Sequence, residues 1–171
     1  MVASGQSITA AKMPKAQMGS LKGPKQANPK LPEGEARPKM LDSAQIIIQF
    51  FTQQTGSPQK ANQILSSLAG KIKKNEVKLV QIGNTVFICM PKPDKSVEVF
   101  TVTIEPDKLA DRIKSSATTL KQMGFSKMYT LSITPQSDEI SKKTGLPVKK
   151  TQTQMMSNGK MVPAYRYEVQ L

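Results

Sequence analysis

The side chains that could carry out acid–base or nucleophilic chemistry are few in this sequence. It has no histidine, the residue type that most often exchanges protons near neutral pH, and one cysteine, Cys89. Cys89 lies within the apolar segment VFICM, and because no histidine is available to activate its thiol, we expect a small core residue. Glu98 and Glu105 are seven residues apart, a spacing that defines no acid–base pair. Side-chain types alone therefore predict no catalytic site.

Metal binding would have to depend on carboxylates. Asp138 and Glu139 are typical of the first turn of a helix, where negative charge is favourable. The sequence contains no DxD-type cluster and no calcium-binding loop. We expect no bound metal.

The chain is strongly basic. Its 171 residues include 25 Lys and Arg against 12 Asp and Glu, a formal net charge of +13, which favours polyanionic partners such as nucleic acid, an acidic protein surface or a membrane face. The length suits one domain plus a tail. No apolar run approaches the ~20 residues of a membrane span, no secretory signal is visible, and the single cysteine fits a reducing compartment. We expect no membrane span and no secretion.

Residues 1–41 are predicted to form an extended, basic N-terminal arm. The segment mixes Pro, Gly, Lys, Ala and Gln without helical or strand periodicity, so it cannot bury enough apolar surface to offset the entropy of ordering. We expect its basic residues to contact partner subunits or nucleic acid. They are Lys12, Lys15, Lys22, Lys25, Lys30, Arg37 and Lys39.

Residues 42–171 are predicted to form one α+β domain. Apolar stripes of helical period and strand-like runs alternate along it, separated by glycine and proline. Helices are expected at 43–55, 58–75, 106–123 and 135–143, and strands at 76–82, 85–90, 96–104, 126–134, 148–156 and 161–171. Gly83-Asn84 and the Asn-Gly turn at 157–160 are expected to close hairpins.

Two passages carry a resemblance to a known fold. ADRIKSSATTLKQMGFSKMYTLSIT (110–134) runs from a helix through a glycine into a strand, and EISKKTGLPV (139–148) does so again. They resemble the third helix, fifth strand and fourth helix of the GNAT (Gcn5-related N-acetyltransferase) fold, with Leu146 in place of the usual Phe. The resemblance covers about 130 residues, without the first strand of the family. It implies a GNAT-like mixed, mostly antiparallel sheet flanked by helices.

The activity motifs of that family have no counterpart in this sequence. Such enzymes bind the cofactor pyrophosphate through the backbone amides of a glycine-rich loop before the third helix. TIEPDKLADR (103–112) takes this place, with no glycine, a proline that lacks an N–H and three acidic residues. Pro135-Gln136 replaces the usual asparagine after the fifth strand, and Ser141 stands where the family has a general-acid tyrosine. The resemblance therefore implies the scaffold without catalysis: no enzyme, no catalytic residue and no cofactor.

A scaffold of this kind behind a basic arm looks like a virion-associated protein of tailed bacteriophages. We therefore expect a non-enzymatic structural or assembly protein of a viral particle, made in the host cytoplasm, that binds other virion proteins and touches DNA non-specifically. One alternative is a sequence-independent nucleic-acid-binding protein, and a second is a divergent acyltransferase. The candidate basic contacts outside the arm are Lys71, Lys73, Lys74, Lys142, Lys143, Lys149 and Lys150.

Overall fold

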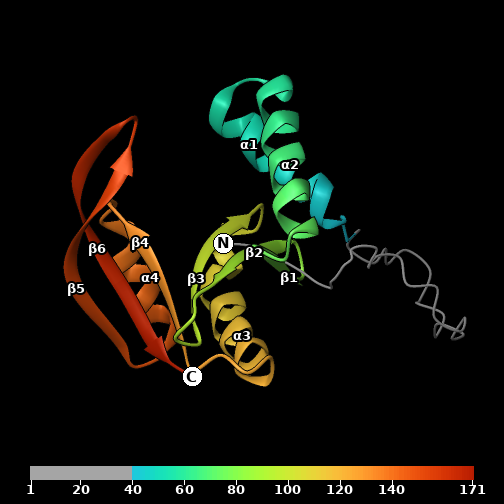
Figure 1. The fold of residues 1–171 in the computed structure, drawn as a ribbon. Helices are drawn as coiled ribbons and strands as arrows, with labels where there is room; N and C mark the ends of the chain where they lie inside the picture. The colour runs from blue at the N-terminus through green and yellow to red at the C-terminus, as the bar shows by residue number, and fades with distance from the viewer. Residues whose placement is uncertain (1–39) are drawn as a thin grey trace, which may run out of the picture.

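A six-stranded sheet with helices on both faces forms the centre of the structure (Figure 1). The computed structural model describes residues 40–171. The helices are α1 (Ser43–Thr55), α2 (Pro58–Lys73), α3 (Leu109–Gln122) and α4 (Gln136–Thr144), with a 3₁₀ turn, η1 (Pro106–Lys108), before α3. The strands are β1 (Lys78–Ile82), β2 (Thr85–Pro91), β3 (Ser96–Thr103), β4 (Lys127–Ser132), β5 (Val148–Ser157) and β6 (Lys160–Gln170). None of the helices in this part of the chain is long and apolar enough to cross a membrane.

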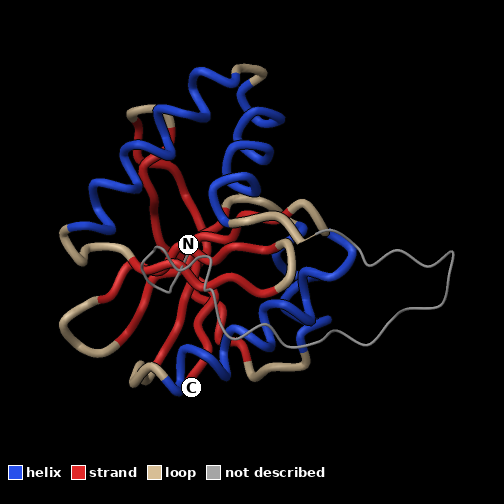
Figure 2. Tube along the Cα trace, turned by 90° about the vertical axis from the view of Figure 1, so that its right-hand side faces the viewer, coloured by secondary structure: helices blue, strands red, loops and turns tan. Residues whose placement is uncertain are grey.

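The sheet is mixed and mostly antiparallel, which confirms the predicted fold class. Its strand order is β1-β2-β3-β4-β6-β5, and only β3 and β4 run parallel. The parallel step follows from the connection between them, because η1 and α3 carry the chain back along the sheet. Helices lie on either side of the strands (Figure 2).

Capping residues define both ends of α1 and the start of α2, while α2 ends at Lys73, two residues before the expected end. Asp42 and Gln45 form a reciprocal capping box at the start of α1, with bonds of 2.9 and 3.0 Å. Gly56 ends α1 at φ 67°, a conformation that costs glycine little. Ser57 then caps α2 ahead of Pro58 at the first helical position.

The core covers both faces of β2. On one face Ile88 lies opposite the β3 residue Phe100, whose ring stacks on Phe51 of α1 at a centroid distance of 6.2 Å. On the other face Phe87 and Cys89 belong to the same buried cluster as residues of α3. The expectation that VFICM is buried on both faces is confirmed for 86–89. Because this strand is apolar throughout, helices must cover it from both sides.

One of two local expectations that involve proline differs from the structure. The helix expected at 106–123 begins as the 3₁₀ turn η1, in which the amides of Lys108 and Leu109 donate to the carbonyls three residues before them, those of Glu105 and Pro106. Pro163, whose missing N–H predicts a place early in the last strand or at an edge, agrees with this expectation: it lies near the start of β6, and the pairing of β6 with β4 begins only at Tyr165.

The N-terminal arm predicted for residues 1–41 lies outside the described residues except for its end. Leu41 is bound to the β1–β2 hairpin: its amide donates to Asn84 Oδ1 at 3.0 Å, and its carbonyl accepts from Gln81 Nε2 at 2.7 Å. The folded unit therefore includes Leu41.

Candidate functional site

The candidate site is a cleft that opens where β3 and β4 part. These strands pair at three positions only, from Ser96 with Lys127 to Glu98 with Tyr129. Beyond this short seam β3 continues to Thr103 along β2, and β4 continues along β6. The facing edges therefore carry main-chain N–H and C=O groups with no strand between them, and a ligand that contains amide groups could pair with both edges.

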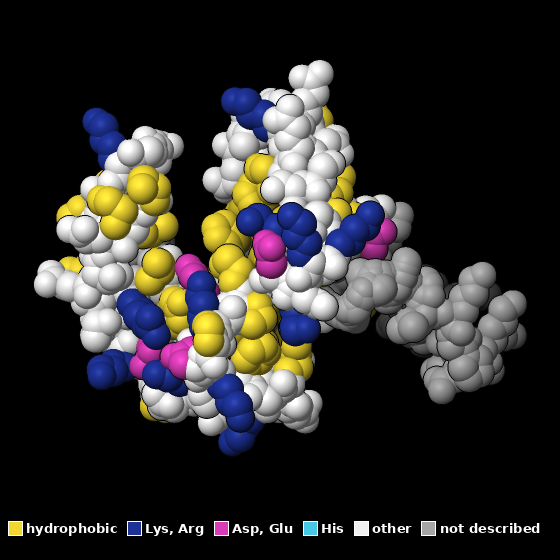
Figure 3. Space-filling view, viewed as in Figure 1, with side chains coloured by type: hydrophobic (Ala, Val, Ile, Leu, Met, Phe, Trp, Pro, Cys, Tyr) yellow, Lys and Arg dark blue, Asp and Glu magenta, His cyan; other side chains and the backbone are white. Residues whose placement is uncertain are grey.

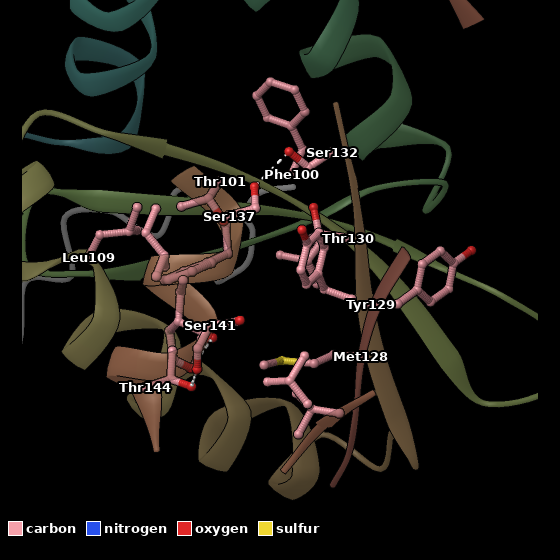
Figure 4. A pocket seen from close by; sticks show the side chains of 18 of the residues that line it. Phe100, Thr101, Leu109, Met128, Tyr129, Thr130, Ser132, Ser137, Ser141 and Thr144 are labelled. Carbon is pink, nitrogen blue, oxygen red and sulfur yellow. Dashed lines mark hydrogen bonds between the residues drawn. The ribbon is translucent and has the colours of Figure 1, made fainter. Parts of the chain in front are cut away.

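A cavity of about 430 Å³ lies in this cleft. Its walls come from β3, β4, α3 and α4, and α1 reaches it through Phe50 (Figure 4). The side chains that line it, all within residues 40–171, are apolar or carry hydroxyl groups, and none is charged. Its volume is in the range of small-molecule sites. The cavity therefore suits a neutral ligand with both apolar and polar atoms.

Hydroxyl side chains line the end of the cleft where β4 leads into α4. Ser137 Oγ donates to Ser132 Oγ at 2.6 Å, and Thr134 Oγ1 lies 3.1 Å from the same Ser132 oxygen (Figure 4). Ser141 and Thr144 also line the cavity and donate to carbonyl groups of their own helix. Ser132 Oγ also accepts from the Thr134 amide at 3.1 Å, so its acceptor positions are filled, whereas the oxygens of Ser137, Ser141 and Thr144 keep acceptor capacity that a ligand amide could use.

Five charged or phenolic side chains, here called the seam cluster, meet at the narrow end of the cleft. Glu98 is paired with Lys92 at 3.1 Å and accepts a long bond of 3.5 Å from the Tyr129 hydroxyl. The Arg166 guanidinium lies 3.6 Å from the centroid of the Tyr129 ring and is paired with Glu168 at 2.5 Å. Tyr129 lines the cavity but points away from the side chains of α4 (Figure 4). The seam cluster thus lies on the sheet face opposite α4.

The environment of the seam cluster favours proton transfer by a neutral phenol. Burial and the negative charge of Glu98 raise the pKa of Tyr129. The bond to Glu98 raises the pKa of Lys92, which stays a cation at neutral pH. Tyr129 is therefore a protonated donor that bonds to the Glu98 carboxylate.

The open end of the cleft adjoins the link from β3 to α3, and an internal carboxylate fills this link. Glu105 accepts from the backbone amide of Asn84 at 2.9 Å and from Arg112 Nη2 at 2.9 Å. These donors hold the pKa of Glu105 below its usual value, the Arg112 bond most of all. The Arg112 side chain lies against Gly83, where an added Cβ would be 2.6 Å from Nη2. The Arg112 guanidinium beside the link is thus already paired within the protein.

The GNAT resemblance implies a coenzyme A thioester, and the residues fit one part of it only. The uncharged cavity and the parted strand edges suit the neutral, amide-bearing arm that carries the thioester. The nucleotide diphosphate needs free backbone amides at the link. The amides of Ile104, Glu105, Lys108 and Leu109 all donate to groups inside the protein, and Pro106 has no N–H. The link does not fit a diphosphate.

The predicted basic clusters lie in three places. Lys71 and Lys73 occupy the last turn of α2 with Lys74 as its C-cap. Lys142 and Lys143 occupy the last turn of α4, where cations complement the helix dipole, and Lys149 is exposed on β5. Lys150 is engaged, because its Nζ lies 2.8 and 2.9 Å from the two carboxylate oxygens of Asp138 and 4.2 Å from the centroid of the Tyr165 ring. The basic residues of the arm lie outside the described residues, and contacts of all these side chains with partners stay predictions.

Sequence reasoning placed one candidate residue correctly and missed the most informative cluster. Cys89 is fully buried in the core, as expected, and burial raises the pKa of its thiol to about 12. Glu98 lies at the last β3–β4 pair and Glu105 in the link after β3, so they do not form a pair. Tyr129 and Arg166 went unnoticed, because their partners come from strands far apart in the sequence. The one available signal was an aromatic residue within a strand that follows a helix–glycine passage.

The fold of this chain matches solved structures of acetyltransferases. No protein-family model and no curated protein sequence matches the chain. A protein from Vibrio cholerae assigned as a ribosomal-protein-serine acetyltransferase superposes with a TM-score of 0.59 at 10% identity, over 75% of this chain and 88% of that one. A spermidine N-acetyltransferase from Vibrio cholerae gives 0.57 at 10% identity, over 77% and 93%. The microcin C7 self-immunity acetyltransferase MccE, solved with acetyl-CoA and AMP, gives 0.57 at 8% identity, over 75% and 87%.

These matches correct the functional expectation drawn from the sequence. The expectation of a non-enzymatic structural protein of a viral particle is wrong, because the solved structures that share this fold are acetyltransferases. The error came from equating loss of the diphosphate loop with loss of the site, although the cleft between β3 and β4 does not depend on that loop. The expected virion partners, DNA contact and location stay predictions. The described part of the chain, residues 40–171, has the GNAT-like acetyltransferase fold.

Proposed function

We propose that this protein is a divergent acyltransferase, which moves an acyl group from a thioester to an amine. The observation that carries the proposal is the uncharged cavity of about 430 Å³ between the parted edges of β3 and β4. A thioester arm placed there would be held by strand edges on both sides and shielded from bulk water. The acetyltransferases with the same fold support the choice of reaction.

The acceptor would approach from the face of the sheet that α1 covers. Phe50 and Phe100 border the cavity on that side, and the Phe100 side chain is 47% exposed. The space-filling view shows the molecule hollowed between the β5–β6 hairpin and the α1–α2 pair, with hydrophobic side chains on both walls (Figure 3). An acceptor with an apolar portion next to its amine would fit this groove.

An ammonium acceptor loses two protons in all and the sulfur gains one, so the reaction releases one proton. The ammonium group loses its first proton, its nitrogen attacks the thioester carbonyl carbon, the C–S bond breaks, the thiolate is protonated to a thiol, and the nitrogen loses its second proton as the amide forms. In this scheme Glu98, which is bonded to Tyr129 but is not part of the cavity lining, would accept the first proton, and Tyr129, a neutral phenol in the lining, would protonate the sulfur. The proton held by Glu98 would then pass to the phenol, and the second proton from the nitrogen would pass to water.

The test is acyl transfer by the full chain from two donors, acetyl-CoA and S-acetylpantetheine, to polyamines and to peptides with free amino groups. Mass spectrometry of the acceptor and titration of the released thiol should show equal amounts of N-acyl product and thiol. Thr101→Phe, which fills the cavity, should abolish the reaction. The control Thr153→Phe, on the exposed strand β5, should leave it intact. Absence of product with both donors, or activity that survives Thr101→Phe, would contradict the proposal.

A further inference from the structure

We infer that the acyl donor for this cleft is a pantetheine thioester that lacks the nucleotide diphosphate of coenzyme A. The inference rests on the proposed acyl transfer and names its substrate class. The uncharged interior of the cleft suits the neutral arm. The link from β3 to α3 at its open end has no free group that would bind an external anion.

The first argument is that Glu105 already occupies the groups that could bind an anion. The Asn84 amide and the Arg112 guanidinium both donate to its carboxylate at 2.9 Å, and Lys108 Nζ lies 4.0 Å from it. The Glu105 side chain is 17% exposed, so this carboxylate is shielded as well as paired. A phosphate could bind these donors only by displacing the Glu105 carboxylate, which is part of the chain and so always present beside them.

The second argument concerns the backbone of the link. In residues 104–109 the amides are used internally or missing, apart from that of Asp107, whose own carboxylate would repel a phosphate. Asp111 adds a further negative charge in the first turn of α3. The positive end of the helix dipole, which would otherwise attract a phosphate, is therefore offset by acidic side chains.

The third argument is the contrast with the cleft itself. Its lining within the described residues carries no charge, and its hydroxyl groups and parted strand edges match the amide and hydroxyl groups of a pantetheine arm. The cleft that would hold the reacting arm is thus present even though the link does not fit a diphosphate. This combination selects a donor by its arm and not by a nucleotide.

The same arm has two sources: a small free thioester, or phosphopantetheine attached to a carrier protein through a single phosphodiester. Both lack the diphosphate and the nucleotide. The experiment therefore uses S-acetylpantetheine, acetyl-CoA and an acetyl-loaded carrier protein as separate probes.

Calorimetric titration of the full chain tests the inference directly. S-acetylpantetheine should bind saturably, and acetyl-CoA should bind about 10-fold more weakly or worse, the factor that 1.4 kcal/mol represents. Glu105→Gln, which keeps an acceptor oxygen for the Asn84 amide but leaves Arg112 unneutralised, should strengthen acetyl-CoA binding and leave S-acetylpantetheine unchanged. Asp107→Asn, on the exposed first turn, should act in the same direction. The matched control Glu76→Gln, on an exposed residue after α2, should change neither affinity.

The outcomes separate this inference from the proposed function. Acetyl-CoA binding as tight as that of S-acetylpantetheine would overturn the inference while acyl transfer could still be observed. Saturable S-acetylpantetheine binding without acyl transfer would support the ligand and overturn the function. No binding of any probe would overturn both. Turnover of the loaded carrier protein, faster than that of S-acetylpantetheine, would assign the carrier-bound arm as the source, and the reverse order would assign the free thioester.

Discussion

Replacing Glu105 with glutamine should lower the stability of the protein by an amount that the structure sets. The carboxylate accepts one bond from a neutral amide, that of Asn84, and one from the Arg112 guanidinium, each of 2.9 Å. Glutamine keeps an acceptor oxygen for the Asn84 amide and loses the charged acceptor for Arg112. A hydrogen bond to a charged partner contributes about 1.5–3 kcal/mol, and because both side chains are partly exposed, we expect a loss of about 1.5–2 kcal/mol. For a chain of this length that corresponds to a Tm lower by roughly 3–8 °C.

The effect should depend on pH in a defined direction. Arg112 and the Asn84 amide depress the pKa of Glu105 in the folded state below its usual value of 4.5. The ionised carboxylate therefore stabilises the fold at every pH above the pKa of the unfolded chain. This contribution is lost as the pH falls through the lower pKa of the folded state. The wild type and Glu105→Gln should thus differ most near neutrality and converge in acid.

Urea denaturation of both proteins, near neutrality and again well below the usual pKa of glutamate, measures this difference in the free energy of unfolding. The control Glu76→Gln removes an exposed carboxylate and should cost little at either pH. A Glu105→Gln loss that is the same at both pH values would refute the reasoning, because it would locate the effect in packing and not in charge.

One labelling experiment and two substitutions test other parts of the structure. Cys89, whose thiol pKa is raised to about 12 by burial, should react with a thiol reagent only after denaturant unfolds the protein; rapid labelling of the native protein would show that the core is open. Gly83→Ala should lower the free energy of unfolding about 1–2 kcal/mol more than Gly145→Ala, as denaturant titration would measure, because both glycines have positive φ but only at Gly83 would the added Cβ, 2.6 Å from Arg112 Nη2, push the guanidinium away from Glu105. Tyr129→Phe should lower the rate of acyl transfer about 100-fold and remove the alkaline decline of the pH–rate profile that ionisation of the phenol produces; an unchanged profile would exclude Tyr129 as the proton donor.

The elements of this fold could be predicted because their signals are local. The Asp42–Gln45 capping box, the glycine at position 56 and the Gly83-Asn84 turn each act over a few residues. The all-apolar β2 required cover on both faces. These signals determined the number, order and type of the helices and strands.

The site could not be predicted in the same way, since it depends on where pairing stops. Nothing in the residues of β3 or β4 marks Glu98 and Tyr129 as their last pair. The Tyr129–Glu98 and Arg166–Tyr129 contacts join strands that are distant along the chain. The sequence already shows that the glycine-rich loop is missing. That the Glu105 carboxylate binds the donors at this place, where the family binds a diphosphate, is evident only from its contacts in the structure.

The seam between β3 and β4 also divides the sheet mechanically. Three residue pairs join its two halves, against seven between β2 and β3 and ten between β5 and β6. A bending motion would therefore concentrate at this seam, where it breaks the fewest hydrogen bonds, and would widen or narrow the cleft while each half stays intact. A ligand arm that pairs with both free edges would take the place of an inserted strand. It would join the two halves into one continuous sheet and, by binding the folded state alone, protect the entire sheet from unfolding.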